Sequence, residues 1–516
     1  MNADRLRRAA TSVTALLFAL LCLLVSTPIA EAAAQPSRYA AIDAYVRHQM
    51  KATNAPGLAY AVVGPGGPIH QRSWGTDGRG DRVTAQTPFL WGSVAKPVTA
   101  TAVMTLVQSG RLRLDDRVVD YLPDLRFGGT AHASKITIRH LLGHTSGLPS
   151  SATSKVTDCF GSGCPRPAGR LRALNDVKPL GAPGTRYAYT SANYLILAAV
   201  VESVTRQPFT DYLRAAVLDP AGMDGAITDA ASTDRHHLSP GHQLLWGRPS
   251  ATADGVDDHG AAYGYLGGDL GDLAAFASLQ LRSGKTASGR TLLTTESVRL
   301  MRQQGRLQPT GEATDYGLGW RVGGLDAPLD RAIWHTGATP GYSSMLFLLP
   351  ERDIALVLQQ NLYGILNDGA VMQVGFGAAQ LLAGGHPPGD SSTSGYYLTV
   401  WGATASALAL MVAAGRSALL LRRPAVLASR RRRITLATAW SLAGALPLIA
   451  FALLVSRTGL RPLMTWLPDA FIAVCVAATA GAVTITLRLI LARRTTHTHR
   501  RSSTTTRYDD VSSSPT

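Results

Sequence analysis

Apolar residues recur along the first part of the chain with two different periods. Residues 37–51 carry an apolar side chain every three or four positions, which predicts an amphipathic helix. The runs 57–63 and 69–74 have the length and composition of strands, and the Gly/Pro cluster 64–68 between them predicts a hairpin turn. Apolar residues at helical spacing over 98–106 predict a buried helix. The chain is thus expected to begin with a helix, a hairpin and a second helix.

The pattern returns to strands near residue 317, after a region of about 128–282 that mixes helical patterns with Gly-rich loops. The predicted strands are residues 317–322, 332–335, 343–349 and 354–359, followed by a helix over about 370–383. Strands therefore lie at both ends of this domain sequence, with helices between them. Such an order predicts an α+β domain in which a mostly antiparallel sheet carries an inserted helical region.

Longer apolar stretches lie on both sides of this domain. Residues 13–25 follow three arginines and precede small residues with an A-x-A pattern, which predicts a signal peptide. Three further stretches are each long enough to cross a bilayer. The predicted organisation is a signal peptide at 1–34, a globular domain at 35–385, a Pro/Gly/Ser/Thr linker at 386–396, a membrane region at 397–491 with spans at about 397–415, 434–455 and 470–487, and a disordered cytoplasmic tail at 492–516.

The net charge of +16 is concentrated outside the globular domain. Residues 35–390 contain 32 basic and 29 acidic side chains, so this part carries +3 and the flanking segments carry +13. A nearly neutral domain argues against nucleic-acid binding through a basic face. Arginines cluster between the first two predicted spans and after the third, which places those segments in the cytoplasm by the positive-inside rule. We therefore expect a multi-pass protein of the cell membrane, in contact with the lipid bilayer, whose globular domain is extracellular.

Candidate chemistry begins with Ser93 and Lys96, which follow Gly92 at the start of the predicted buried helix. Residues three apart share one face of a helix, so the two side chains are within reach of each other. A serine hydroxyl needs a base beside it to act as a nucleophile, and burial can lower the pKa of a lysine far enough for it to be that base. This spacing alone also fits a helix cap followed by a surface lysine, so the interpretation depends on other segments.

Two later segments offer the remaining parts of such a site. Tyr189 precedes an apolar helical run, and a phenol close to a lysine can act as a phenolate or as a proton shuttle. The alternative for Tyr189 is an ordinary half-buried tyrosine. Residues 334–342 predict a strand with small residues, along whose edge a substrate can lie while backbone N–H groups face an oxyanion.

Together these segments resemble the penicillin-recognising serine hydrolases, which include class C β-lactamases, D-alanyl-D-alanine carboxypeptidases, D-aminopeptidases and related esterases. The resemblance rests on three motifs in this order: Ser93-x-x-Lys96, Tyr189-Thr190-Ser191 and His335-Thr336-Gly337. The stretches 136–149, 316–320 and 339–342 are similar to the same family. The resemblance spans about residues 37–383 and implies a β-lactamase-like fold. It does not extend to the three predicted spans.

The resemblance implies a role for each catalytic residue. Ser93 would form an acyl-enzyme, and Lys96 would lower the cost of removing its proton. Tyr189 would act as the general base, sharing a proton with Lys96, and would later activate the deacylating water. The backbone N–H groups of Ser93 and Ala338 would form the oxyanion hole.

The expected substrate-binding residues are Ser191, His335, Thr336 and Gly337, and two of them depart from the family pattern. His335 stands where the best-known members carry lysine, and Ser191 stands where the motif usually ends in asparagine. A weaker fixed charge and a shorter side chain shift the expectation from efficient β-lactam turnover towards peptidase or esterase activity. The expected function is an exported serine hydrolase acting on D-amino peptides, esters or amides of the cell envelope. The alternative is a receptor that binds penicillin or cell-wall peptides and signals through its spans.

Two pairs of residues invite a metal-site interpretation. Cys159 and Cys164 lie close together in a loop-like stretch, and in an oxidising compartment we expect them to form a disulfide. A metal site there would need further cysteines or histidines at ligand spacing. His140 and His144 lie in and just after a short predicted helix and are interpreted as structural. No metal and no organic cofactor is expected.

Overall fold

A computed structural model describes residues 39–161, 163–303, 315–423 and 429–502 of the 516-residue chain. The predicted signal peptide lies outside the described residues. The chain divides into two compact units, Met1–Ala41 and Ile42–Thr516. The first contributes only the start of helix α2 (Ala40–Thr53) to the described residues, so the features below belong to the second.

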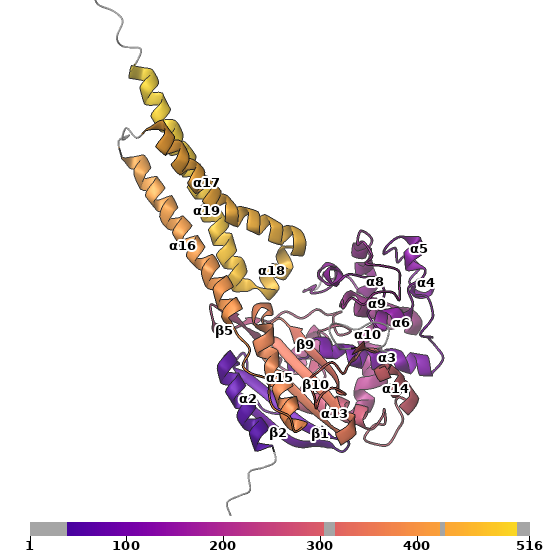
Figure 1. The fold of residues 1–516 in the computed structure, drawn as a ribbon. Helices are drawn as coiled ribbons and strands as arrows, with labels where there is room; N and C mark the ends of the chain where they lie inside the picture. Colours follow the sequence, from indigo (N-terminus) through magenta and orange to yellow (C-terminus); the bar gives the residue numbers. More distant parts are fainter. Residues whose placement is uncertain (1–38, 162, 304–314, 424–428, 503–516) are drawn as a thin grey trace, which may run out of the picture. The chain divides into compact units, whose positions relative to one another are not determined.

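The second unit contains a seven-stranded sheet in the order β2-β1-β11-β10-β9-β8-β7, in which neighbouring strands pair antiparallel (Figure 1). Its strands are β1 (Gly57–Gly64), β2 (Gly67–Gly75), β7 (Asp315–Tyr316), β8 (Arg321–Val322), β9 (Ile333–Thr339), β10 (Tyr342–Leu349) and β11 (Ile354–Gln360). The first hairpin therefore lies beside the last strands, and the predicted α+β class with an antiparallel sheet is confirmed. The short pairs outside this sheet are β3 (Phe89–Leu90) with β6 (Gly267–Gly268) and β4 (Gly241–Leu245) with β5 (Arg248–Ala253).

The central strands are buried on both faces, which is why β1 and most of β10 and β11 are apolar runs. Successive side chains of a strand point to opposite faces of the sheet. On β10, Phe347 packs against Phe376 of α15 (Asp368–Leu382). Its neighbour Leu346 instead joins the core cluster that includes α13 (Leu270–Leu281). The two helices thus cover the sheet from opposite sides.

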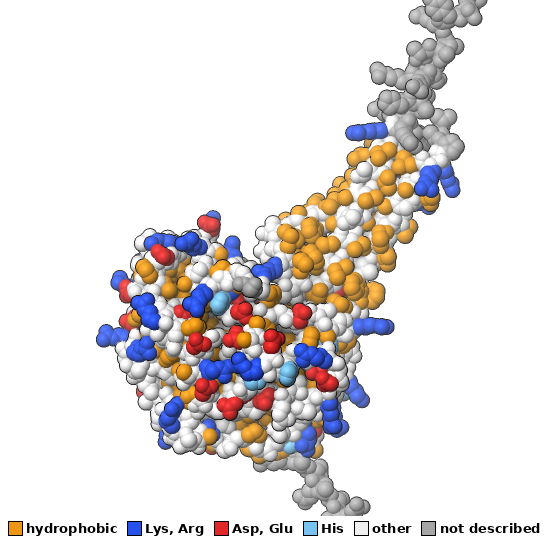
Figure 2. Space-filling view, turned by 180° about the vertical axis from the view of Figure 1, so that it is seen from behind, with side chains coloured by type: hydrophobic (Ala, Val, Ile, Leu, Met, Phe, Trp, Pro, Cys, Tyr) orange, Lys and Arg blue, Asp and Glu red, His pale blue; other side chains and the backbone are white. Residues whose placement is uncertain are grey.

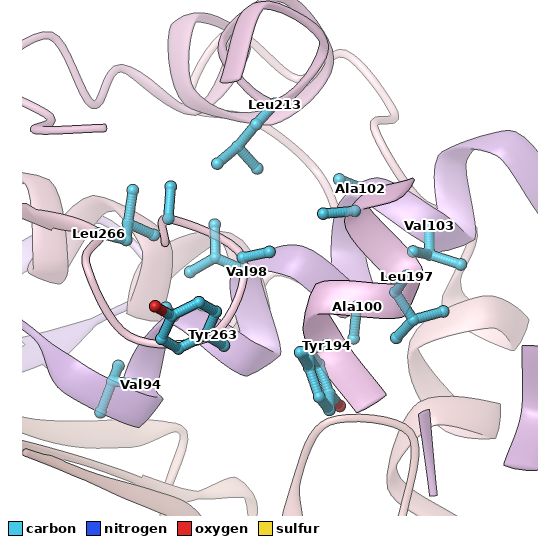
Figure 3. Packing of buried hydrophobic residues seen from close by; sticks show 14 of the residues in the cluster. Val94, Val98, Ala100, Ala102, Val103, Tyr194, Leu197, Leu213, Tyr263 and Leu266 are labelled. Carbon is cyan, nitrogen blue, oxygen red and sulfur yellow. The ribbon is translucent and has the colours of Figure 1, made fainter. Parts of the chain in front are cut away.

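The inserted helical region packs around α3 (Ala95–Gln108) and α9 (Ala192–Thr205), which are buried along most of their length. Figure 3 shows Val98 of α3 and Leu197 of α9 within one apolar cluster. Because α3 begins two residues after Ser93, this packing fixes the position of the candidate nucleophile. The other α-helices of the domain are α4 (Val118–Tyr121), α5 (Thr130–Ala133), α6 (Ile138–Leu142), α7 (Thr153–Val156), α8 (Pro167–Arg170), α10 (Phe209–Leu213), α11 (Asp219–Ala221), α12 (Ala230–Arg235) and α14 (Thr295–Gln303).

Three long helices follow the domain: α16 (Ser394–Arg422), α17 (Arg430–Thr458) and α19 (Pro468–Ser502). All three are long and apolar enough to cross a membrane. Large apolar side chains are exposed along them, and Figure 2 shows hydrophobic side chains gathered over this part of the surface. So much exposed apolar surface is unfavourable in water and suits a lipid environment.

Several predicted boundaries are wrong. The predicted strand 317–322 is two short strands, because Gly319, with φ +88°, turns the chain between β7 and β8. The patterns also miss the hairpin β4–β5 and the short helix α18 (Leu460–Trp466) between α17 and α19. Helix α16 begins at Ser394, inside the predicted linker, and α19 continues to Ser502, so the first part of the predicted disordered tail is helical. The remainder of that tail lies outside the described residues.

Candidate active site

Ser93 lies in a short helical turn, Gly92–Val94, that joins β3 to α3. Gly92 has φ +53°, a backbone conformation that favours glycine, and it lets the chain turn sharply before the serine. Ser93 is half-buried and lines a cleft of about 450 Å³. The buried start of α3 therefore presents a hydroxyl to a space that a substrate can enter, as a nucleophile requires.

Lys96 is fully buried one helical turn later, and its Nζ makes three hydrogen bonds. It lies 2.7 Å from the Oγ of Ser93, whose hydroxyl donates to it when the amine is neutral, and it donates to the Oγ of Ser191 at 3.2 Å. It also donates to the carbonyl oxygen of Tyr263 at 2.8 Å. Burial, together with the nearby cation of Arg321, holds the pKa of Lys96 well below its usual range. A lysine of lowered pKa in contact with a serine hydroxyl can accept the hydroxyl proton.

Tyr189 lines the same cleft and packs against Lys96, whose Nζ is 5.0 Å from the centre of the Tyr189 ring. Burial raises the pKa of Tyr189 to about 12, although a hydrogen bond with Ser93 and the charge of Arg321 offset part of that rise. The phenol therefore keeps its proton at neutral pH. The structure thus brings Ser93, Lys96 and Tyr189 together, and of the two candidate bases only the lysine has a pKa displaced towards the neutral range.

Strand β9 passes so close to Ser93 that two positions have room only for glycine. A Cβ on Gly92 would overlap the backbone nitrogen of Ala338. A Cβ on Gly337 would lie 2.7 Å from the backbone nitrogen of Ser93 and would overlap the carbonyl oxygen of Trp91. The backbones of Ser93 and Ala338 are therefore neighbours at the cleft, and two N–H groups in such a place suit a developing oxyanion.

Ser191 and Thr336 also line the cleft. Ser191 is the residue before α9, and its backbone N–H donates to the Oγ1 of Thr153 at 3.0 Å. Its hydroxyl accepts a hydrogen bond from Lys96, so this short side chain is tied to the base rather than extended into the cleft. Thr336 belongs to β9, whose edge forms one side of the site.

His335 lines the cleft but is only 1% exposed, and both of its ring nitrogens have partners. Nδ1 faces the carbonyl oxygen of Thr336 at 2.6 Å, so it carries the proton, and Nε2 accepts from the hydroxyl of Tyr316 at 3.1 Å. Burial and the cations Arg321 and Lys96 hold the pKa of His335 well below its usual range. A neutral, fully bonded ring does not supply the positive charge that a substrate carboxylate needs.

Arg321 supplies that charge, and the sequence motifs do not identify it. It is the only lysine or arginine among the described residues that line the cleft. Its guanidinium carbon is 5.5 Å from the centre of the Tyr189 ring and 5.2 Å from that of Trp334. Within the described ranges no carboxylate pairs with it. Its one sequence signal is its position directly after the motif 316–320.

The two histidines near α6 have structural partners. The Nδ1 of His140 accepts the backbone N–H of Thr137 and completes the N-terminal cap of α6. His144 is buried, and its Nδ1 lies 3.1 Å from the side-chain nitrogen of Asn193. The His144 ring centre is 4.4 Å from that of Tyr189, so the histidine ring packs against the tyrosine ring.

Cys159 and Cys164 form a disulfide, with Cα atoms 5.7 Å apart. The loop that they close follows Asp158, which lines the cleft. Across the described part of the chain, no group of three or more His, Cys, Asp or Glu side chains is arranged to hold a metal ion.

The family model described as Beta-lactamase matches residues 42–371, which is more than half of the chain. This chain belongs to the beta-lactamase family. The match includes the sheet and the helical region, and it ends before α16. The family is one of serine hydrolases whose members include penicillin-binding proteins and esterases, as the resemblance of the motifs implies.

Individual relatives agree with this assignment. The chain is 33% identical to "Penicillin-binding protein 4" of Amycolatopsis lactamdurans over 319 residues, which is 60% of this chain and 81% of that relative. It is 25% identical to "Protein flp" of Staphylococcus aureus (strain COL) over 323 residues, 62% of each chain. The matched segment therefore spans less than two thirds of the staphylococcal relative.

Solved structures show the same fold. An octameric penicillin-binding protein homologue from Pyrococcus abyssi aligns with a TM-score of 0.58 at 20% identity, covering 68% of this chain and 78% of that one. EstCE1, a hydrolase with promiscuous acyltransferase activity, aligns with a TM-score of 0.54 at 22% identity, covering 62% and 92%. The expected β-lactamase-like fold is confirmed.

Proposed function

We propose that this chain is an exported, membrane-anchored serine hydrolase that forms an acyl-enzyme on Ser93 and acts on D-amino peptides, esters or amides of the cell envelope. The hydrogen bond between Lys96 and Ser93 carries this proposal, because it pairs a nucleophile in a cleft with a base of lowered pKa. Membership of the family supports acyl transfer as the class of reaction.

In the proposed first step, neutral Lys96 accepts the hydroxyl proton while the Oγ of Ser93 bonds to the substrate carbonyl carbon. The N–H groups of Ser93 and Ala338 stabilise the oxyanion. Tyr189, which is protonated in this state, gives a proton to the leaving group and regains one from Lys96. In the second step a water molecule replaces the leaving group, passes one proton to the same relay and releases the acid, and Ser93 recovers its hydroxyl proton.

The charge of the cleft supports one substrate class in particular. Arg321 is a permanent cation beside Tyr189, and the neighbouring His335 is neutral. A guanidinium group binds a carboxylate through paired, charge-assisted hydrogen bonds. We therefore place peptides with a free carboxylate next to the scissile bond ahead of neutral esters and amides.

The ends of the long helices support an extracellular position for the domain. The loop helix α18 and the first turns of α16 and α19 make hydrogen bonds to the domain. The other end of α16 carries Arg416, Arg422 and Arg423, and the start of α17 carries Arg431, Arg432 and Arg433. Because arginine-rich loops stay in the cytoplasm, a domain attached to the opposite helix ends lies outside.

The experiment is intact-mass spectrometry of the full chain in nanodiscs after exposure to a fluorophosphonate, a penicillin, an activated ester and a D-alanyl peptide. A covalent adduct that is absent from Ser93→Ala supports the nucleophile, and the reagent that labels and then clears identifies the substrate class. A folded protein that gives no adduct with any reagent would exclude the proposed acyl-enzyme.

A receptor for penicillin or cell-wall peptides is the second candidate. One observation favours it. Trp466 of α18 donates a hydrogen bond at 2.9 Å to Asp158, a cleft residue. A ligand in the cleft would therefore lie beside a residue that is bonded to the short helix between α17 and α19. A stable adduct that never clears, for every reagent tested, would favour the receptor over the hydrolase.

A further inference from the structure

Helix α18 lies against the domain on two sides. The side-chain nitrogen of Gln243, on β4, donates to the carbonyl oxygen of Thr465 at 2.9 Å. The indole N–H of Trp466 donates to the Oδ2 of Asp158 at 2.9 Å. The two partners come from the β4–β5 hairpin and from the segment just before the disulfide loop, so the short helix is held from two directions.

The first turns of α16 and α19 are attached to the same hairpin. The hydroxyl of Tyr396 donates to Asp469 at 2.7 Å and accepts the backbone N–H of Gly247 at 2.8 Å. The backbone N–H of Trp246 donates to Asp469 at 3.2 Å. The indole N–H of Trp246 donates to the hydroxyl of Thr404 at 2.8 Å. Helix α18, which ends two residues before α19 begins, is therefore fixed by its own contacts and by those of its neighbour.

Two residues of α18, Pro462 and Trp466, line the cleft that contains Ser93. The Trp466 ring packs edge to face on Tyr363, with ring centres 6.0 Å apart. Ile365, just after Tyr363, also lines the cleft and is 47% exposed. All four side chains line the cleft, and we call this group the α18 wall.

The orientation of the Trp466 ring is set by a buried carboxylate. Asp158 accepts the indole N–H on one oxygen and the hydroxyl of Tyr265, at 2.8 Å, on the other. Asp158 is itself buried, so losing the indole N–H would leave a buried carboxylate oxygen without this hydrogen bond, which is energetically unfavourable. The ring is thus a fixed surface, and a fixed apolar surface can select the group that it contacts.

We propose that the α18 wall is part of the substrate site, and that Trp466 is a specificity-determining residue that selects substrates, including the carboxylate-bearing peptides placed first above, whose acyl part carries an extended apolar chain. This inference rests on the proposed acyl transfer at Ser93. An apolar chain laid against Trp466, Pro462 and Ile365 removes apolar surface from water, and this gain grows with chain length. The long helices then contribute to substrate choice as well as to anchoring.

The test compares acyl chain lengths in the full chain reconstituted in nanodiscs. The measured quantity is the ratio of kcat/KM for p-nitrophenyl octanoate to that for p-nitrophenyl acetate. We expect Trp466→Ala to lower this ratio about tenfold. Trp466→Phe keeps most of the ring surface and should keep most of the ratio. Because all variants are measured in the same nanodiscs, partition of the octanoate into lipid is common to them.

The matched control is Met464→Ala, on the same helix. Met464 is 57% exposed and is not a cleft-lining residue, so the ratio should stay within about twofold of wild type. Ile365→Ala removes part of the α18 wall from outside α18 and should also lower the ratio. That variant separates loss of the wall from displacement of the helix.

Labelling of Ser93 by a small fluorophosphonate distinguishes failure of the proposed acyl transfer from failure of the proposed role of the α18 wall. If wild type is not labelled, the proposed function fails, whatever the ester ratios are. If wild type is labelled, and the ratio is unchanged in both Trp466→Ala and Ile365→Ala, the α18 wall does not select substrate and the inference is overturned.

Discussion

Burial shifts the pKa values of the two ionisable side chains beside Ser93 in opposite directions. It lowers the pKa of Lys96 and raises that of Tyr189, since it disfavours the charged form of each. Near neutral pH both groups are thereby pushed towards their uncharged forms. A proton can then pass between serine, lysine and tyrosine without first placing a charge in the empty cleft.

The pH profile of acylation follows from these directions. Acylation needs neutral Lys96, so its rate with an activated ester should rise with pH and level off, with a midpoint below the ordinary lysine pKa of about 10.4. In Tyr189→Phe the rising limb should remain while the plateau falls about 100-fold. Stopped-flow measurement of the acylation burst from pH 5 to 10 tests this. Loss of the limb in Tyr189→Phe, with its retention in Lys96→Met, would make the tyrosine the base.

Arg321 should govern the preference for a free carboxylate. Arg321→Met should lower kcat/KM for a D-alanyl peptide roughly 10- to 100-fold, equivalent to a charged hydrogen bond of about 1.5–3 kcal/mol. The same peptide with an amidated end should change little. The pH limb of Arg321→Met should move to higher pH, because a cation that lowers the pKa of Lys96 is gone. His335→Gln is the comparison variant, and a loss of carboxylate preference there instead would assign recognition to the histidine.

At the scale of elements, the site depends on how β9 meets the turn before α3. Gly337→Ala would push the strand away from Ser93, because the new Cβ would overlap the carbonyl oxygen of Trp91. We expect acylation to fall by about 100-fold or more, which is the effect of losing one oxyanion-hole donor. Gly369→Ala is the control, since this residue is exposed, does not line the cleft and has nothing within 4 Å of an added Cβ. The measurement is burst kinetics on the folded variants. An equal loss of acylation rate in Gly337→Ala and in the control variant would contradict this role of β9.

The sequence predicts the elements whose apolar period is uninterrupted. The runs in β1, β10 and β11 and the helical pattern of α3 are strong because both faces or most sides are buried. The hairpin β4–β5 is missed because no residue of β5 is buried and the strand carries no apolar alternation. Helix α18 is missed because its seven residues are too few to establish a period.

Some residues of the candidate site can likewise be predicted from the sequence, and others cannot. Ser93 and Lys96 can be predicted because a helix places residues three apart on one face. Arg321 cannot, since its place in the cleft depends on the fold that brings β8 beside Tyr189. Trp466 is 373 residues from Ser93 in sequence, and only the docking of α18 joins the two in one cleft. The neutral state of His335 likewise follows from burial that the motif itself does not show.

At the scale of the whole molecule, the orientation across the membrane can be tested with single cysteines. In a background with Cys22→Ser and Cys475→Ser, Met464→Cys should react with a membrane-impermeant maleimide in intact spheroplasts. Arg423→Cys should react only after permeabilisation. Both positions are exposed, and they lie at opposite ends of α17 and its neighbours. Labelling of Arg423→Cys in intact spheroplasts, without labelling of Met464→Cys, would place the domain in the cytoplasm.

The contacts of Tyr396 and Asp469 with the β4–β5 hairpin have a consequence for how the protein meets its substrate. A domain on a flexible tether sweeps a volume set by the length of the tether. A domain that is hydrogen-bonded to the first turns of its helices instead holds its cleft at a fixed height relative to those helices. If the long helices cross the bilayer as proposed, the cleft meets only substrates that pass at that height, so a higher density of the protein in the membrane would shorten the search for substrate but leave its reach unchanged.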